Sequence, residues 1–275
     1  MSMLPMLVEP EQLHPALTHE ALLIVDMSNP ENYASKHLPG AVNLPYANIM
    51  QAVPPAGGML PDEQHLSKVL SAIGLRSDHH VVAYDGEQGG RAARFLWTLD
   101  VLGHSGLSLL NGGLSAWKQA AFPLNDVTTS PSPSQYKAQR ANPLALADKA
   151  YILSCLNEAR ATRPALLDAR SAAEYAGLDV RAKRGGHIPG AVNLNWLDTI
   201  DSGNALRFKP DTELRAILNE LGLQQEQEII TYCQTHHRSA HSYWMLKHLG
   251  YPHIRGYAGS WSEWGNDPSV PIEKL

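Results

Sequence analysis

Cysteine is scarce in this sequence. Only Cys155 and Cys233 occur among its 275 residues, far fewer than a small secreted scaffold held together by disulfides would use. A disulfide framework is therefore excluded as the basis of the fold. Each thiol is expected to be either a small core side chain or a reactive group.

Long apolar runs and clusters of basic residues are also missing. No stretch of about 18 apolar residues occurs, and the opening MSMLPMLVEPEQL has neither the basic region nor the apolar core of a signal peptide. The 22 Lys and Arg residues are scattered and the net charge is −5, so a phosphate backbone would meet no basic surface. We therefore expect a cytoplasmic protein that binds neither a membrane nor nucleic acid, and we also expect a monomer.

An internal repeat organises the rest of the chain. The length suits one large domain or two ordinary ones, and a composition of 44% hydrophobic and 18% charged residues is that of a globular protein. The phrase HLPGAVNL at residues 37–44 returns as HIPGAVNL at residues 187–194. Likewise, the apolar run 81–85 is answered by 229–233, and each is followed by a helical and then an aromatic segment. An interval of about 150 residues indicates a duplicated domain and excludes a solenoid.

The boundary between the two copies lies in a Pro- and Ser-rich stretch at residues 128–135. We place an N-terminal domain at residues 1–126, a linker at 127–147 and a C-terminal domain at 148–275. Within each copy, short β-branched runs alternate with amphipathic stretches such as Asp211–Leu221. This alternation predicts the α/β class, with two similar domains that each contain a parallel sheet covered by helices on both faces.

Cys233 lies where a reactive thiol would be useful. It directly follows the apolar run 229–232 and precedes a polar stretch that leads into a helix. Ligands of open parallel sheets bind beyond the carboxyl ends of the strands, and a helix N-terminus offers N–H groups and a partial positive charge. A thiol there should have a lowered pKa, helped by Arg238 and by His236 or His237 when protonated. The alternative is an inert core cysteine.

That alternative suits Cys155 better, because Cys155 lies in the helical stretch Tyr151–Arg160. The adjacent pair His236 and His237 could suggest a metal site. Neighbouring side chains seldom converge on one ion, however, and no third ligand follows at a recognisable spacing. We expect both histidines to shape the loop.

Four other histidines are expected to have no chemical role. His37 and His187 begin the two HxPGA phrases, where each would fix the turn into Pro-Gly-Ala. His79 and His80 precede a strand and are predicted to lie on the surface.

The duplicated HxPGAVNL phrase and the loop Cys233-Gln-Thr-His-His-Arg238 resemble the tandem-domain rhodaneses, which are thiosulfate and 3-mercaptopyruvate sulfurtransferases. The resemblance extends from about Leu22 to Trp264. It implies two similar α/β domains, a C-terminal copy whose Cys233 alternates between thiol and persulfide, and no organic cofactor or metal. The first copy has Asp85 in the place of Cys233. Because a carboxylate cannot carry a persulfide, we expect that copy to be catalytically silent.

The resemblance also implies the reaction. Cys233 would take the outer sulfur of thiosulfate, release sulfite, and pass the sulfur to cyanide or to a thiol, including one on a protein. Arg238 would neutralise the leaving sulfite. Converging N–H groups would hold the donor and the terminal sulfur, and the loop residues expected to supply them are Gln234, Thr235, His236, His237 and Arg238.

Three further residues are assigned to substrate binding through the resemblance. Asp168 and Arg170 match positions close to the reactive cysteine. Trp196 follows the second repeated phrase and either lines the mouth of the site or belongs to the core.

Glu174 departs from the family pattern, since many relatives carry an arginine at this position that binds the charge of the donor. A carboxylate facing the loop would repel the donor, so Arg170, Arg184 or Arg238 would have to replace that arginine, or the donor differs. If Glu174 instead points to solvent, its charge is screened. Repulsion would disfavour mercaptopyruvate, with its distant carboxylate, more than compact thiosulfate.

Three alternative functions stay open. The nearest is a 3-mercaptopyruvate sulfurtransferase. A cysteine-dependent phosphatase would need a wider Cys-x5-Arg loop, whereas Cys233 and Arg238 enclose four residues. A sulfur carrier or regulatory module is less consistent with the retained Cys233.

Overall fold

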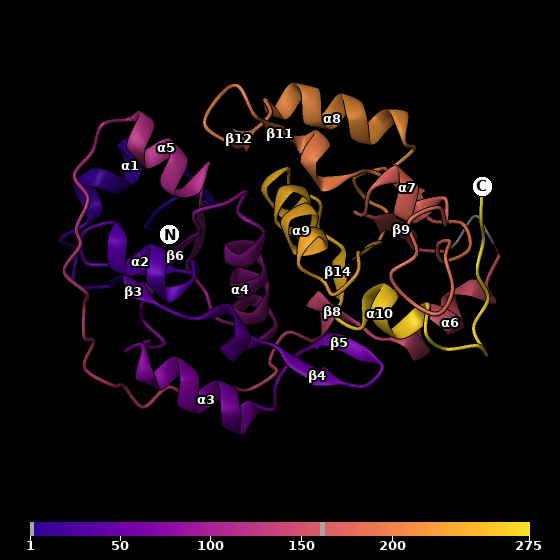
Figure 1. Ribbon diagram of the computed structural model, residues 1–275, viewed down its shortest axis with the longest axis horizontal. Helices are drawn as coiled ribbons and strands as arrows, with labels where there is room; N and C mark the ends of the chain where they lie inside the picture. The colour runs from indigo at the N-terminus through magenta and orange to yellow at the C-terminus, as the bar shows by residue number, and fades with distance from the viewer. Residues whose placement is uncertain (1–2, 160–162) are drawn as a thin grey trace. The chain divides into compact units, whose positions relative to one another are not determined.

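Two compact units make up the computed structural model, which describes residues 3–159 and 163–275 (Figure 1). The first unit contains the residues up to Met50, Leu60–Asn142 and Ile200–Phe208. The second unit contains Gln51–Met59, Pro143–Thr199 and Lys209–Leu275. Each unit therefore includes a short segment from the other half of the sequence.

The first unit is built on a five-stranded parallel sheet of order β1-β7-β6-β2-β3. Its strands are β1 (Leu7–Val8), β2 (Leu22–Asp26), β3 (Val42–Asn43), β6 (His80–Tyr84) and β7 (Leu107–Leu110). Its α-helices are α1 (Pro10–Leu13), α2 (Pro30–Ser35), α3 (Glu63–Ala72), α4 (Gly90–Val101) and α5 (Gly113–Gln119).

The second unit repeats this plan with the parallel order β10-β9-β13-β14-β8. Its strands are β8 (Leu146–Ala147), β9 (Ala165–Asp168), β10 (Val192–Asn193), β13 (Ile229–Tyr232) and β14 (Ile254–Tyr257). Its α-helices are α6 (Lys149–Leu156), α7 (Ala172–Tyr175), α8 (Asp211–Glu220), α9 (Arg238–His248) and α10 (Ser260–Trp264). The prediction of two similar parallel-sheet α/β domains is confirmed.

Two antiparallel hairpins complete the units. β4 (Gln51–Val53) and β5 (Ala56–Met59) form one hairpin, and β11 (Ile200–Asp201) and β12 (Arg207–Phe208) form the other. Each comes shortly after the repeated HxPGAVNL phrase, yet each belongs to the unit built mainly from the other half of the chain. Short 3-10 helices occur at His14–Ala16, Tyr46–Ile49, Pro143–Ala145 and Trp196–Thr199.

Equivalent aromatic side chains anchor the two cores. Trp117 and Trp264 are fully buried, and each belongs to a cluster of buried hydrophobic residues. The indole N–H of Trp117 donates to the Pro123 carbonyl and that of Trp264 to the Pro271 carbonyl, both at 2.8 Å. Because a buried indole N–H needs an acceptor, these bonds fix the segment that follows each sheet.

The histidines of the two HxPGA phrases have matching structural contacts. Nδ1 of His37 lies 2.7 Å from the Tyr33 carbonyl, and Nδ1 of His187 lies 2.9 Å from the Tyr175 carbonyl. A carbonyl can only accept, so Nδ1 carries the proton and donates in both rings. Each ring also stacks on the same tyrosine whose carbonyl it binds.

Two expectations need correction or a limit. His79 and His80 are buried, so the prediction of surface positions is wrong. Burial, with a smaller effect of His104, lowers the pKa of His80 to about 4, and its Nε2 lies 2.7 Å from Ser108 Oγ. α6 ends at Leu156, and Arg160, the last residue of the helical stretch expected around Cys155, lies outside the described residues.

Cys155 is buried on α6, and burial raises the pKa of its thiol. This position is that of a core side chain. In the part of the chain that the structure describes, no helix is both long and apolar enough to span a bilayer.

Candidate active site

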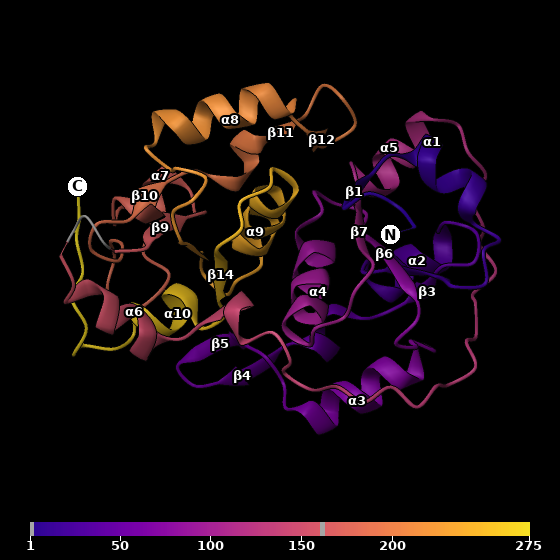
Figure 2. The same cartoon turned by 180° about the vertical axis from the view of Figure 1, so that it is seen from behind.

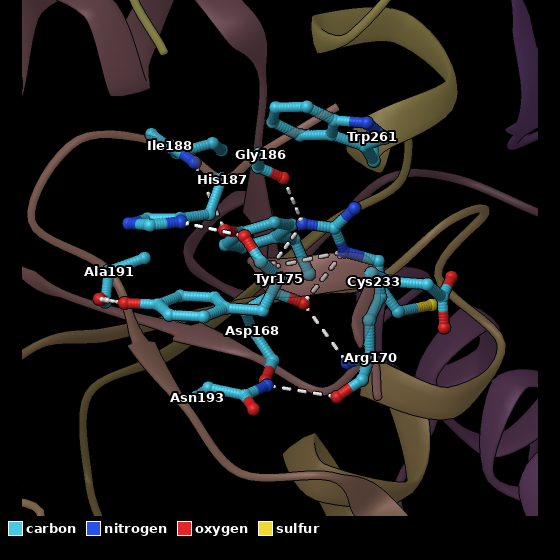
Figure 3. Close-up of polar contacts among 12 residues, drawn as sticks. Asp168, Arg170, Tyr175, Gly186, His187, Ile188, Ala191, Asn193, Cys233 and Trp261 are labelled. Atoms are coloured by element: carbon cyan, nitrogen blue, oxygen red, sulfur yellow. Dashed lines mark hydrogen bonds and ion pairs between the residues drawn. The ribbon is translucent and has the colours of Figure 1, made fainter. Parts of the chain in front are cut away.

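Cys233 is the first residue after β13, and the loop that follows it ends where α9 begins at Arg238. β13 lies between β9 and β14 in the sheet, and α9 lies alongside β14 in both views of the molecule (Figures 1 and 2). Tyr232 and Asp168 are register partners at the ends of their strands. Figure 3 shows Cys233 together with the residues at the end of β9. The predicted strand, loop and helix arrangement is therefore present around the thiol.

The first turn of α10 holds the first residues of the loop in place. The N–H of Trp261 donates to the Cys233 carbonyl and that of Ser262 donates to the Gln234 carbonyl, both at 2.9 Å. The N–H of Cys233 donates to Ser260 Oγ at 3.3 Å. Cys233 is thus fixed through both of its backbone polar groups, which favours a single orientation of the thiol.

The surroundings of the buried thiol favour its ionised form. Burial alone would raise the pKa of Cys233, but the positive charge of Arg238 and hydrogen bonds from the side chain and N–H of Ser239 and the N–H of Thr235 outweigh it, so the pKa is lowered. A thiolate is the nucleophilic form of cysteine. The site is therefore suited to attack on an electrophilic atom.

The corresponding loop of the first unit holds a carboxylate with its backbone N–H groups. There the carboxylate of Asp85 occupies the position of Cys233 and accepts four backbone hydrogen bonds at 2.9–3.1 Å. The donors are the N–H groups of Glu87, Gly89, Arg91 and Ala92. Counted from the residue after each strand, the equivalent positions in the second loop are Thr235, His237, Ser239 and Ala240. The first loop is thus an anion-binding nest of backbone amides, and the second loop has the same length between its strand and its helix.

Glu174 is paired with Arg238. Its carboxylate accepts from both terminal nitrogens of the guanidinium, at 2.6 and 2.8 Å, and its side chain is only 1% exposed. It also completes the capping box of α7 with Ser171. Burial opposes ionisation, but Arg238 and the Ser171 N–H lower the pKa of Glu174 to about 2. Glu174 therefore does not point to solvent, and its charge is balanced by the arginine of the loop.

Asp168 and Arg170 form a second buried ion pair. Arg170 Nε lies 2.9 and 3.0 Å from the two oxygens of Asp168, and its terminal nitrogen donates to the Gly186 carbonyl at 2.7 Å (Figure 3). The guanidinium also lies over the ring of Trp261, 4.5 Å from its centroid. These contacts engage the guanidinium with the protein itself, and they brace the segment that holds the Cys233 carbonyl.

Arg184 likewise binds protein carbonyls. Its terminal nitrogens donate to Val270 at 2.9 Å, to Trp264 at 3.0 Å and also to Asp267. Of the three arginines considered as replacements for a basic residue at position 174, Arg238 is the one whose charge acts on Cys233.

The predicted residues Trp196 and Gln234 and the unpredicted His241 lie in or near the loop. Trp196 is 8% exposed, and its ring lies 5.8 Å from His237 and 5.3 Å from His241. Gln234 donates through its amide to the Arg181 carbonyl at 3.0 Å. Burial lowers the pKa of His241 to about 3, so this ring is neutral near pH 7.

Sequence reasoning missed Ser239, which is fully buried. Its Oγ lies 2.8 Å from Nδ1 of His236, and it also binds the Cys233 thiol. The available signal was its place in the first turn of a helix directly after the loop, where hydroxyl side chains can reach an anion.

The structure therefore contains two repeated parallel-sheet units, and the second has a buried cysteine with a lowered pKa in the loop between a strand and a helix. The rhodanese-like domain family matches the chain at residues 9–120 and 148–267. The chain belongs to this family.

Curated relatives match nearly the whole chain. The thiosulfate sulfurtransferase of Pseudomonas aeruginosa is 41% identical over 275 residues, which cover 98% of this chain and 97% of that protein. The thiosulfate sulfurtransferase of Azotobacter vinelandii is 41% identical over 277 residues, with the same coverage. The sulfur carrier protein TtuD of Thermus thermophilus is 33% identical over 251 residues, covering 88% of this chain and 87% of that protein.

Solved structures share the fold. The anaerobic ergothioneine biosynthesis enzyme from Chlorobium limicola, in complex with its natural substrate trimethyl histidine, superposes with a TM-score of 0.85 at 20% identity over 98% of this chain and 70% of that one. The crystal structure of YnjE gives 0.83 at 22% identity, covering 98% and 68%.

Proposed function

We propose that this chain is a thiosulfate sulfurtransferase in which Cys233 carries the transferred sulfur as a persulfide. The two relatives at 41% identity support the reaction class. The observation that carries the proposal is the loop around Cys233, whose thiol has a lowered pKa and whose counterpart in the first unit holds the carboxylate of Asp85 with four amides. Such a loop suits a thiolate, and it equally suits the charged terminal sulfur of a persulfide.

The proposed reaction has two displacement steps. The Cys233 thiolate attacks the outer sulfur of thiosulfate, a new S–S bond forms, and sulfite leaves with the electron pair of the bond that breaks. A nucleophilic acceptor such as the cyanide ion or a thiolate then attacks the terminal sulfur, a new bond to that sulfur forms, and Cys233 leaves as a thiolate with the electron pair of the S–S bond. The amides of Thr235 and Ser239 and the charge of Arg238 act on the Cys233 sulfur, which they stabilise as the leaving thiolate. No proton transfer is required in either step.

We propose thiosulfate as the preferred donor, and 3-mercaptopyruvate as the alternative. Because Glu174 engages both terminal nitrogens of Arg238, the guanidinium does not offer a free fork to the carboxylate of mercaptopyruvate. Thiosulfate is compact, and the loop amides suffice for it. Steady-state rates with both donors at one ionic strength test this choice, and a preference for mercaptopyruvate would contradict it.

We also propose that the acceptor can be a thiol on another protein, a role supported by the 33% identical sulfur carrier relative. The first domain, residues 1–126, is proposed to be catalytically silent because its loop holds Asp85, and the domain at residues 148–275 carries the chemistry.

Intact-mass spectrometry tests the proposal directly. After incubation with thiosulfate, the protein is expected to gain the mass of one sulfur atom and to lose it again on addition of cyanide. Cys233→Ala should show no gain, while Cys155→Ser should behave like the parent, since Cys155 is a core residue on α6. Sulfur uptake by the Cys233→Ala protein would refute the assignment of the nucleophile.

A further inference from the structure

A hairpin from the first half of the sequence lies against the loop of Cys233. The hairpin β4–β5 belongs to the second unit, and β5 lies beside α10 in both views (Figures 1 and 2). The N–H of Gly57 donates to Ser262 Oγ at 3.0 Å. Gly58 approaches the loop so closely that a Cβ on it would lie 2.3 Å from the carbonyl oxygen of Thr235. Only glycine fits this approach without movement of one backbone or the other.

Thr235 links that contact to the reacting sulfur. Its N–H is one of the hydrogen-bond donors to Cys233, and its carbonyl belongs to the peptide group that joins it to His236. His236 adopts a φ of 54°. A residue with a side chain holds such a left-handed conformation only when its surroundings enforce it. Gly58 lies against the peptide group between Thr235 and His236, and the orientation of this peptide group determines the φ of His236.

We propose that Gly58 is a positioning residue for sulfur transfer, because through its contact with Thr235 the hairpin Gln51–Met59 keeps the loop amides directed at the sulfur of Cys233. This inference rests on the proposed function of Cys233. Under this proposal, the first half of the sequence contributes to catalysis through the hairpin Gln51–Met59. This contribution does not depend on the loop of the first unit, in which Asp85 stands in the place of the cysteine.

The neighbouring glycine supplies a matched control. A Cβ on Gly57 would lie 3.4 Å from Cγ2 of Thr235, an ordinary van der Waals contact, and alanine keeps the N–H that binds Ser262. Gly58→Ala and Gly57→Ala therefore add the same methyl group to adjacent positions of one strand. Both are made with Cys155→Ser, so that Cys233 is the sole thiol.

Two quantities are measured for each protein: the rate of sulfur uptake from thiosulfate by intact mass, and the pH dependence of alkylation of Cys233 by iodoacetamide. Gly58→Ala is expected to take up sulfur about tenfold to a hundredfold more slowly, because displacement of the loop misplaces the reacting group. Its alkylation midpoint should move upward by about one pH unit as hydrogen bonds to the thiolate are lost. Gly57→Ala should stay within about twofold of the parent rate.

Ser262→Ala provides a second route to the same question if Gly58→Ala fails to fold, as judged by circular dichroism. It removes the acceptor of the Gly57 N–H without adding bulk, and its own N–H still binds the Gln234 carbonyl. A smaller upward shift of the alkylation midpoint is expected. An unchanged midpoint and uptake rate in folded Gly58→Ala, or in Ser262→Ala where Gly58→Ala does not fold, would overturn the role of Gly58, and so would an equal loss in Gly57→Ala. If the parent takes up no sulfur at all, the proposed function fails, while the alkylation midpoints still decide the role of Gly58.

Discussion

Ser239 and Arg238 act on the sulfur of Cys233 from adjacent positions at the start of α9. Arg238 contributes charge, whereas Ser239 contributes a hydroxyl and an N–H. His236 approaches the Ser239 hydroxyl with Nδ1 at 2.8 Å. Since the hydroxyl has a single proton, it donates to the thiolate only when the ring nitrogen donates to it. The Ser239 hydroxyl thereby links the thiolate to His236.

Ser239→Ala is expected to raise the pKa of Cys233, because one hydrogen bond that stabilises the thiolate is lost while the N–H at this position is retained. A rise of about one pH unit would lower the alkylation rate near neutral pH by up to about tenfold. Ser239→Thr keeps the hydroxyl and should restore the parent profile, and Ser242→Ala removes a buried hydroxyl elsewhere on the same helix. An identical pH profile for Ser239→Ala would show that the hydroxyl does not act on the thiolate.

Glu174 makes the stability of the protein sensitive to acid. Its pKa is about 2 in the folded protein and 4.5 ordinarily, so its pairing with Arg238 stabilises the fold fully above pH 4.5, and this contribution is lost as the pH falls through about 2. The contribution is on the order of 3 kcal/mol. Between pH 5 and pH 2, denaturant unfolding of the parent should therefore lose more free energy than that of Glu174→Gln. Parallel losses in both proteins would contradict this, with the exposed Glu220→Gln as the control.

The first residue of α10 carries a conformational cost that its counterpart at the start of α5 avoids. Ser260 has a φ of 50°, and the equivalent residue after β7 is Gly113 with a φ of 53°. The N–H of the residue after each, Trp261 or Leu114, donates to the carbonyl of Cys233 or Asp85. Both loops therefore need the left-handed turn, but only the second has a side chain there, and its hydroxyl accepts from the Cys233 N–H.

Two substitutions separate the strain at Ser260 from its hydrogen bonds. Ser260→Ala and Ser260→Gly both remove the hydroxyl, but only glycine relieves the left-handed backbone. Ser260→Gly should therefore be more stable than Ser260→Ala by about 1 kcal/mol in denaturant unfolding. Greater stability of the alanine variant would mean that the backbone at this turn is not strained.

The elements of this protein were more predictable than their contacts. Strand β13 and helix α9 follow from a short apolar run and a helical pattern, and the repeat predicts a second sheet like the first. The hairpin Gln51–Met59 is different, since nothing in its sequence says which unit it joins. Glu174 is similar: its pairing with Arg238 spans 64 residues and depends on side-chain geometry that no local pattern encodes. His79 and His80 were placed on the surface for the same reason, because burial of a histidine depends on distant neighbours.

At the scale of the whole molecule, the two units contain equivalent loops that differ in the acidic side chain they hold: the carboxylate of Asp85 in the first and the thiol of Cys233 in the second. In the first, an aspartate fixed to the chain permanently occupies the amide nest. In the second, Cys233 stands in the place of that aspartate, and under the proposed function a transferred sulfur would occupy the amide nest. The first loop also has Gly90 where the second has Arg238, the residues at which α4 and α9 begin. The proposed catalytic silence of the first unit is therefore expected to have two causes: Asp85 replaces the cysteine, and Gly90 replaces the arginine.

The double variant Asp85→Cys, Cys233→Ala separates the effect of the missing cysteine from that of the missing arginine. The four amides that bind Asp85 should stabilise a thiolate at the same place, so the new thiol should react with iodoacetamide at neutral pH faster than Cys155, whose pKa is raised by burial. Sulfur uptake from thiosulfate should nevertheless remain about tenfold or more below that of the parent, because Gly90 stands in the place of Arg238, whose charge acts on the sulfur of Cys233 in the second loop. Peptide mass spectrometry distinguishes the two cysteines in both assays. Alkylation no faster than that of Cys155 would show that the amide nest alone does not activate a thiol, whereas parent-like sulfur uptake would show that Asp85 is the sole cause of the silence of the first unit.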